Sequence, residues 1–152
     1  MIWILNCLNI VKFVIINQKI KTMKKILLIL LVTVPLLGFG QCVIGDCKNG
    51  VGTYLFEDGS IMDGSWKDGQ PNGIVSEISY DENGGLLCVF NGEMKMGVIS
   101  GWGTETLYDK EGYLLGTYVG NWEDNDYHGW GIWIWNNGEI EKGTYKNGDL
   151  IK

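Results

Sequence analysis

Histidine is the side chain most often used for proton transfer, and the 152-residue chain contains one, His128. It stands between Tyr127 and Gly129 in a run of turn-forming residue types. Without a second histidine, a Ser-His or Cys-His nucleophile pair could be built only around this residue. We therefore interpret His128 as a turn residue and not as a general base.

Acidic residues require a separate test, because two carboxylates suffice for glycoside hydrolysis. Glu123, Asp124 and Asp126 cluster in one predicted turn, and Glu139 and Glu141 share one face of a predicted strand. No sequence feature buries any of them, and 18 acidic residues make such clusters frequent by chance. We interpret them as solvated charge. The sequence therefore predicts no catalytic residue and a protein that is not an enzyme.

Metal and cofactor sites also lack their usual patterns. Residues 124–126 resemble the start of a calcium loop, but Trp135 stands where the bidentate glutamate is required. Cys42 and Cys47 have no second Cys or His pair that would complete a four-ligand zinc site. The glycines of residues 101–103 open a predicted strand instead of a helix, unlike those of dinucleotide and phosphate loops. We predict no metal and no cofactor.

Residues 23–40 have the pattern of a secretory signal peptide. Two lysines follow Met23, residues 26–37 are mostly apolar, and a small-x-small pattern ends at Gly40. We predict cleavage after Gly40 and export to the periplasm or the extracellular space. Residues 1–22 are then interpreted as a misannotated upstream extension.

Two alternatives to a cleaved signal peptide have weaker support. Residues 2–16 and 26–37 could be two membrane segments, but both are short for a bilayer and Lys12 interrupts the first. Lipid attachment at Cys42 would require a small residue before it, where Gln41 stands.

Export changes what the cysteines are expected to do, because oxidising compartments favour disulfides. Cys42 and Cys47 are the predicted pair, within an N-terminal cap at residues 41–49. Closing this short loop should contribute about 2 kcal/mol. The alternative is two free thiols. Cys88 shares strand parity with Phe90, so we interpret it as a buried, inert thiol.

The charges are divided unevenly along the chain. All 18 acidic residues follow Gly40, together with seven of the 12 basic residues, so residues 41–152 carry a net charge of −11 and no arginine. Such a surface repels phosphate and offers no guanidinium group to hold it. We therefore expect no binding of nucleic acid, and none of phosphoinositides or other anionic membranes.

The glycine-rich body is built from units of 23 or 28 residues. Each unit opens with a Gly-x-Gly-like segment and carries a second glycine cluster further on. Asp58-Gly59 and Asn137-Gly138, between the apolar runs of the first and last units, are typical of hairpin turns. We predict four β-hairpin units, at residues 50–72, 73–100, 101–128 and 129–151.

The repeated unit resembles the MORN repeat, which has Gly-x-Gly-Thr, a turn glycine and then aromatic-x-Gly-x-Trp. Residues 101–104 and 118–122 of the third unit match best, whereas the second unit has Val75 and Met94 in place of a glycine and the tryptophan. The resemblance implies an all-β fold, an elongated single-layer antiparallel sheet of stacked hairpins. In that family such arrays serve mostly as interaction scaffolds, with membrane or phosphoinositide association proposed for some members.

Strand alternation predicts how such a sheet forms a core without a second layer. Residues two apart share a face, so Tyr118 and Trp122 flank Gly120, and a neighbouring ring can lie over its bare backbone. Met62 and Glu141 occupy the place of Tyr118 in the first and last units. The predicted aromatic ladder consists of Trp66, Phe90, Met94, Tyr118, Trp122 and Tyr145.

The last unit is apolar on both faces of its first strand. Trp133 and Trp135 share one face, Ile132 and Ile134 share the other, and Trp130 precedes them. A single-layer sheet cannot bury both faces, so we predict that Trp130, Trp133 and Trp135 form a partner surface. The alternative is that these rings complete the ladder and the C-terminal cap.

These patterns predict an exported, non-catalytic scaffold that binds a protein partner through an aromatic-rich sheet surface. The alternative is binding of a glycan or cell-wall polysaccharide, because exposed Trp and Tyr rings stack on sugars and nearby carboxylates accept hydroxyl hydrogen bonds.

Overall fold

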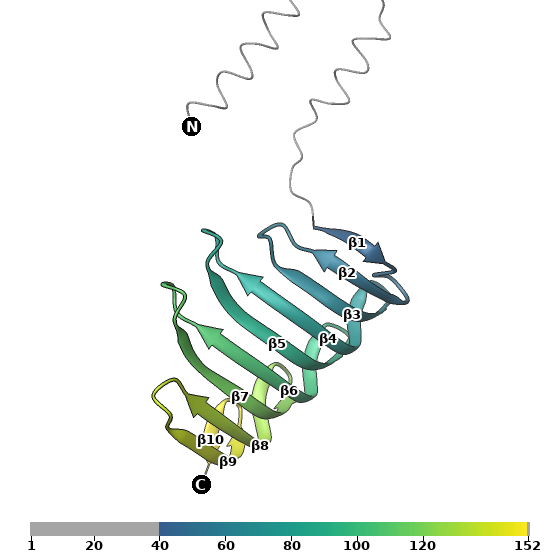
Figure 1. Cartoon of the computed structure of the whole chain (residues 1–152). Helices are drawn as coiled ribbons and strands as arrows, with labels where there is room; N and C mark the ends of the chain where they lie inside the picture. Colours follow the sequence, from purple (N-terminus) through teal and green to yellow (C-terminus); the bar gives the residue numbers. More distant parts are fainter. Residues whose placement is uncertain (1–39, 152) are drawn as a thin grey trace, which may run out of the picture. The chain divides into compact units, whose positions relative to one another are not determined.

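The computed structural model describes residues 40–151. The predicted upstream extension at residues 1–22 and the predicted signal peptide, apart from Gly40, lie outside these residues. The described part contains ten strands and no helix (Figure 1). The strands are β1 (Gln41–Gly45), β2 (Val51–Leu55), β3 (Ile61–Lys67), β4 (Gln70–Tyr80), β5 (Leu86–Lys95), β6 (Val98–Tyr108), β7 (Leu114–Glu123), β8 (Asp126–Trp135), β9 (Ile140–Lys146) and β10 (Asp149–Ile151). Among residues 40–151 there is no helix with the length and apolarity needed to cross a membrane.

Each strand pairs antiparallel with the next, and the ten strands form one open sheet (Figure 1). This confirms the predicted all-β sheet of consecutive hairpins. The hairpin tips follow from local residue types. In the tip between β4 and β5, the Asp81 carboxylate accepts hydrogen bonds from the N–H groups of Asn83 and Gly85 at 2.8 and 2.7 Å.

The turns between successive units form a stack at the other end of the strands. The turns at residues 68–69, 96–97, 124–125 and 147–148 have positive φ at both positions, as in the type I′ turns that suit twisted hairpins. Each of the last three turns donates a backbone hydrogen bond to the strand residue just after the previous turn, as in the bond from Gly97 N–H to the Pro71 carbonyl at 2.8 Å, and the first turn bonds to Lys48 of the cap. The stack therefore brings equivalent residues of successive units into line.

The core lies on one face of the sheet, which we call the ladder face. Cross-strand pairing aligns its residues in rows, as in Glu105 beside Tyr118 and Tyr118 beside Trp133. Exposed fractions in the core run from 0% for Tyr118 to 7% for Met94. All six residues of the predicted ladder are buried here. The buried hydrophobic set is Met62, Trp66, Val75, Phe90, Met94, Tyr118, Trp122, Trp133 and Tyr145.

A row of small residues lets these rings lie against the backbone. Gly103 pairs with Gly92 on one side and Gly120 on the other. A Cβ on Gly103 would lie 2.7 Å from the Phe90 ring, so a larger residue would displace that ring. Val75 takes a place in the same row and is buried. The second unit thus has valine in place of the repeat glycine, and the valine side chain fills the buried position.

The N-terminal edge is closed by the predicted cap. Cys42 and Cys47 form a disulfide beside the β1 and β2 pair. In the loop that it encloses, Asp46 accepts hydrogen bonds from the N–H groups of Lys48 and Asn49 at 2.9 and 3.1 Å. The bonds from Asn49 and then Lys48 hold the pKa of Asp46 below its ordinary value.

Candidate functional site

The densest part of the ladder face surrounds Tyr127, the second residue of β8. Its ring stacks on Tyr118 with centroids 4.0 Å apart and planes 24° apart, and meets Trp122 edge to face at 4.6 Å. Trp133 and Tyr145 lie further out, with centroids at 5.7 and 6.1 Å. Four aromatic side chains thus enclose one ring in arrangements that aromatic pairs favour.

A carboxylate completes this ring site. The Tyr127 hydroxyl donates a hydrogen bond to Glu105 Oε2 at 2.6 Å. Burial raises the pKa of Glu105, although the bond from Tyr127 opposes that change. Burial, together with the same hydrogen bond, raises the pKa of Tyr127 strongly, so its hydroxyl remains a donor at neutral pH.

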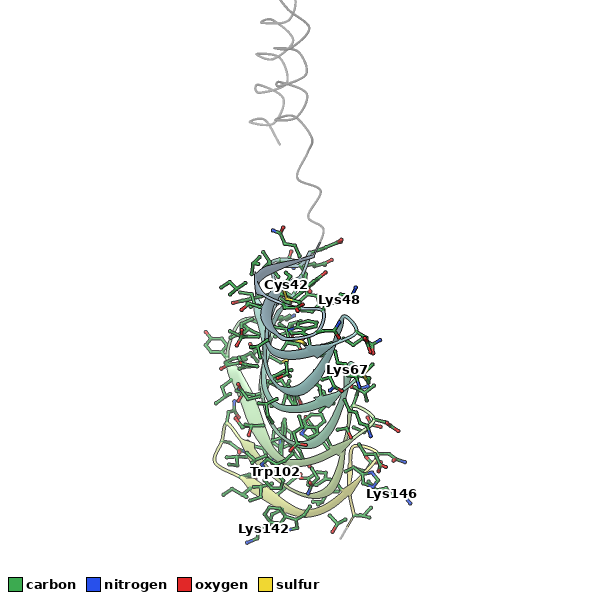
Figure 2. All side chains as sticks on the ribbon, turned by 90° about the vertical axis from the view of Figure 1, so that its right-hand side faces the viewer. Cys42, Lys48, Lys67, Trp102, Lys142 and Lys146 are labelled. Carbon is green, nitrogen blue, oxygen red and sulfur yellow. A yellow bond between two sulfur atoms is a disulfide. The ribbon has the colours of Figure 1, made fainter. Side chains whose placement is uncertain are left out.

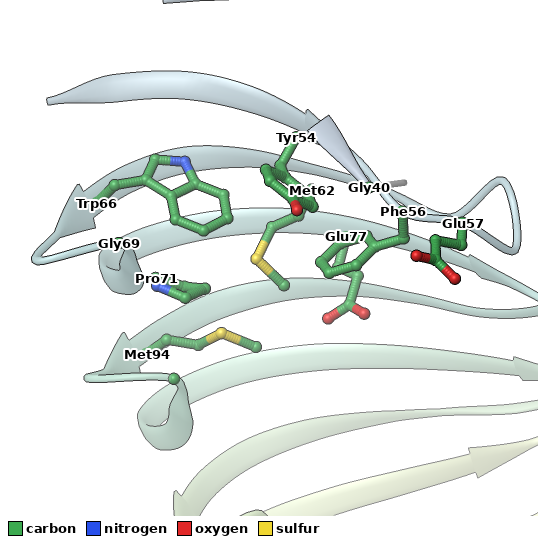
Figure 3. Close-up of a pocket in the computed structure, with 11 residues that line it drawn as sticks. Gly40, Tyr54, Phe56, Glu57, Met62, Trp66, Gly69, Pro71, Glu77 and Met94 are labelled. Carbon is green, nitrogen blue, oxygen red and sulfur yellow. The ribbon is translucent and has the colours of Figure 1, made fainter. Parts of the chain in front are cut away.

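The first repeat contains an open groove on the same face, with a volume of about 640 Å³ (Figure 3). Pro71 and Trp66 lie toward the turn side, and Tyr54 and Glu77 lie toward the hairpin tips. Gly40, the last residue of the predicted signal peptide, borders the groove. Its lining residues also include Phe56, Glu57, Met62, Gly69, Met94 and Gly97.

Repeat equivalence relates this groove to the Tyr127 site. Tyr127 pairs with Trp122 at the start of β8, as Pro71 pairs with Trp66 at the start of β4. The five neighbours of Tyr127 each have an equivalent that lines the groove. Tyr118, Trp122, Trp133, Tyr145 and Glu105 correspond in that order to Met62, Trp66, Glu77, Met94 and Tyr54. The groove is therefore the ring site of the first repeat without its ring.

No family model matches the chain, and no curated protein matches it. The resemblance to MORN repeats thus rests on the sequence motif, while the structure independently shows the sheet of consecutive hairpins.

The opposite face carries one exposed apolar side chain from the opening segment of every unit. Val51, Ile74, Trp102 and Trp130 are the middle residues of the Gly-x-Gly-like segments, with exposed fractions from 45% to 68%. We call these four residues the exposed row. Polar residues separate them, because the row is paired with Ser65, Glu93, Asn121 and Thr144.

The structure does not unite the three tryptophans predicted to form a partner surface. Trp133 is 6% exposed and packs in the core, whereas Trp130 is 49% exposed on the opposite face. Trp135 shares the ladder face with Trp133 and is 37% exposed, its ring centroid 4.9 Å from that of Trp133. Strand alternation separates residue 130 from residues 133 and 135, and the Tyr118 and Tyr127 rings bury Trp133.

The single histidine, the acidic clusters and Cys88 do not line an enclosed site. His128 Nε2 lies 3.1 Å from Glu123 Oε2 at a partly exposed position. Asp124, Asp126, Glu139 and Glu141 are exposed, as is Glu123. Cys88 is partly buried, and burial raises the pKa of its thiol. Within residues 40–151 no group of three or more His, Cys, Asp or Glu side chains is arranged to hold a metal ion.

The lysines are dispersed along the sheet. Figure 2 shows Lys48 and Lys67 toward the β1 end, with Lys142 and Lys146 toward the β10 end. Among the described residues, the lining of the groove includes two carboxylates and no lysine. The ladder face of the first repeat is therefore locally acidic.

Sequence reasoning missed Glu77 and Glu105, the carboxylates of the ladder face. Both stand two residues after the small-residue row, at Val75 and Gly103, and period-two alternation therefore places them among the rings. That signal was available in the sequence. The sequence also shows tyrosine at position 127 and proline at position 71. That these two residues are equivalent, and that one fills a site which the other leaves open, follows only from the stacking of the turns in the structure.

Proposed function

We propose that the protein is a non-catalytic, exported scaffold of four MORN-like repeats that binds a protein partner. The observation that carries this function is the exposed row, in which every unit presents one apolar side chain to solvent. These side chains lie on the face away from the core, so they add nothing to the ladder. An exposed apolar side chain at the same position of every unit gives a repeat protein an extended surface that one partner can contact at several points.

The repeat geometry indicates the form of the partner. Two strand spacings separate neighbouring members of the row, which corresponds to about 10 Å. A partner that contacts several members would extend across the sheet. Solenoid and repeat proteins commonly bind in this way, with a surface that grows with the number of units.

Sequence and structure support the other parts of the proposal to different degrees. The hairpin sheet agrees with the MORN-like motif, and the Cys42 to Cys47 disulfide suits an oxidising compartment. The signal-like residues 23–40 indicate export. The net charge of −11 on residues 41–152 and the dispersed lysines favour a neutral or basic protein over nucleic acid, phosphoinositides or anionic membranes.

The test is capture of a partner with matched surface variants. The tagged protein is cross-linked in the native envelope fraction, and a stoichiometric protein partner is expected. The double substitution Trp102→Ser and Trp130→Ser should remove this partner, whereas Asn91→Ser, at an exposed polar position of the same face, should retain it. Absence of a partner, or equal capture by the double variant, would contradict the proposal.

Glycan binding is the second candidate function, and one observation favours it. Trp102 and Trp130 lie one repeat apart on the same face, and Asn121 between them donates a hydrogen bond to the Trp130 carbonyl at 3.3 Å. Two half-exposed indoles beside amide groups could stack on sugar rings. A change in tryptophan fluorescence on addition of cell-wall polysaccharide, absent from the Trp102→Ser and Trp130→Ser variant, would favour this function over protein binding.

A further inference from the structure

We propose that the groove of the first repeat binds a tyrosine side chain of the protein partner, presented by a basic segment. This inference rests on the proposed scaffold function and specifies a second contact, on the ladder face. The occupant is defined by the molecule itself, because Tyr127 fills the equivalent site of the third repeat.

The ring of Tyr127 is the template for the ligand. It lies among Tyr118, Trp122, Trp133 and Tyr145, while its hydroxyl reaches Glu105. Every one of these positions has an equivalent in the lining of the groove, where Trp66 keeps the residue type of Trp122. The carboxylate changes place, because Tyr54 stands at the position of Glu105 and Glu77 at the position of Trp133. A site that has the same backbone geometry and the same turn stack should accept the same kind of side chain.

Pro71 leaves this site open. Its pyrrolidine ring is held close to the backbone and cannot reach across the sheet as the phenol of Tyr127 does. A volume of about 640 Å³ lies within the range of ligand pockets. The aromatic and thioether side chains of Trp66, Met62 and Met94 supply apolar contacts for an incoming ring.

The polar groups of the groove indicate a hydroxyl and positive charge. Glu77 projects among the groove residues (Figure 3), and its Oε1 accepts a hydrogen bond from Ser79 Oγ at 3.0 Å. A carboxylate can accept several hydrogen bonds, so a phenol hydroxyl can bind there as well. Glu57 adds a second negative charge, and no lysine lies in the lining. Lysine or arginine beside the tyrosine would complement these charges.

The binding test uses a defined peptide. Acetyl-Gly-Lys-Tyr-Lys-Gly-amide is titrated into the purified ¹⁵N-labelled protein, and the Trp66 indole N–H resonance is followed. The peptide should shift this resonance saturably. Replacing its tyrosine by phenylalanine should weaken binding about ten-fold, through loss of a hydrogen bond to a charged group. Replacing its lysines by glutamates should weaken it at least about ten-fold at low salt.

Protein variants locate the site. Pro71→Tyr should fill the groove from within and abolish peptide binding, whereas Pro71→Ala should retain it. Glu77→Gln should weaken binding about ten-fold, whereas Glu93→Gln, at an exposed position of the opposite face, should not. Unchanged far-UV circular dichroism and a cooperative urea transition establish that each variant is folded. If Pro71→Tyr fails this check, the Glu77→Gln and Glu93→Gln pair decides the result.

The outcomes separate this inference from the scaffold function. Loss of binding in Pro71→Tyr and weakened binding in Glu77→Gln, with binding retained in Trp102→Ser and Trp130→Ser, would support the groove as a tyrosine receptor. Equal binding of the tyrosine and phenylalanine peptides would overturn it, as would no peptide binding. A shift caused by N-acetylglucosamine instead of the peptide, or protein dimers that Pro71→Tyr dissociates, would assign another occupant. Capture of a partner without any effect of groove variants would leave the scaffold function standing and refute the receptor.

Discussion

The first and third repeats place different side chains on nearly the same framework. In the third, Tyr127 crosses the ladder face and joins a cluster of aromatic rings. In the first, Pro71 occupies the equivalent position and a groove remains. The side chain at one position, the second residue of the strand after the inter-repeat turn, thus fills this part of the ladder face in the third repeat and leaves it open in the first.

The ladder beneath the two positions differs as well. Tyr118 in the third repeat is fully buried among rings, and its hydroxyl donates a hydrogen bond to the Asn121 carbonyl at 2.9 Å. Met62 in the first repeat is buried too, but it lines the groove. Both side chains are therefore buried, but only Tyr118 is enclosed by other rings, whereas Met62 borders an open groove. We expect the side chains around Met62 to move more easily into the space left by a smaller residue than those around Tyr118.

The largest expected effect is the loss of the central ring of the third repeat. Tyr118→Ala should reduce the free energy of unfolding by about 4 kcal/mol, because a large cavity opens in a densely packed cluster. Met62→Ala should cost about 2 kcal/mol, since its neighbours can close around a smaller vacancy. Urea unfolding, followed by fluorescence and circular dichroism, measures both. Equal losses would mean that the two repeats are packed alike.

Much of the framework was predictable because it depends on local pattern. Period-two alternation and the recurring glycines defined the hairpins and the ladder, which includes Tyr118 and Trp122. The spacing of Cys42 and Cys47 indicated the disulfide that the structure contains. These features involve residues that are close in sequence or equivalent within the repeat.

The partner surface was harder to predict because burial depends on neighbours from other strands. Trp133 lies next to Tyr118 across the sheet and beneath the ring of Tyr127, and neither contact follows from the apolar character of the last unit. The groove depends on the absence of a large side chain at Pro71. Because the units differ in length and sequence, the lack of a large side chain at one position is hard to recognise from the sequence.

The next effect tests the polar end of the filled site. Tyr127→Phe keeps the ring and removes the donor to Glu105, so it should reduce stability near neutral pH by about 1.5 kcal/mol. The loss should shrink when Glu105 is protonated at acid pH. Tyr113→Phe, at a tyrosine that is 69% exposed, is the matched control and should change stability by less than about 0.5 kcal/mol. If Tyr127→Phe costs no more stability than this control, the hydrogen bond to Glu105 does not stabilise the protein.

Filling the groove should make the first repeat resemble the third. Pro71→Tyr is expected to raise the free energy of unfolding by about 1 kcal/mol relative to Pro71→Ala, as cavity-filling substitutions commonly do. The comparison with alanine removes the effect of proline on the unfolded chain. Thermal and urea unfolding of the two variants provide the measurement. A destabilised Pro71→Tyr protein would show that the groove cannot accommodate a ring attached at this position.

The smallest effect concerns pH, and its sign should differ between the two regions. Burial raises the pKa of Glu105 above its ordinary value of 4.5, so the native state retains this proton more tightly than the unfolded state. Its contribution to stability therefore falls as pH rises from the ordinary value through the raised one. Glu105→Gln should lessen that decline, because the amide does not ionise.

Asp46, in the cap beside the first repeat, should respond in the opposite direction. Hydrogen bonds from Asn49 and Lys48 lower its pKa below the ordinary value of 3.8. Its contribution is present above that value and is lost as pH falls through the lowered pKa. Asp46→Asn should therefore reduce stability near neutral pH and flatten the acid side of the profile. Unfolding free energies measured in urea from acid to neutral pH test both variants, and changes of the same sign would show that burial and hydrogen bonding do not distinguish the two carboxylates.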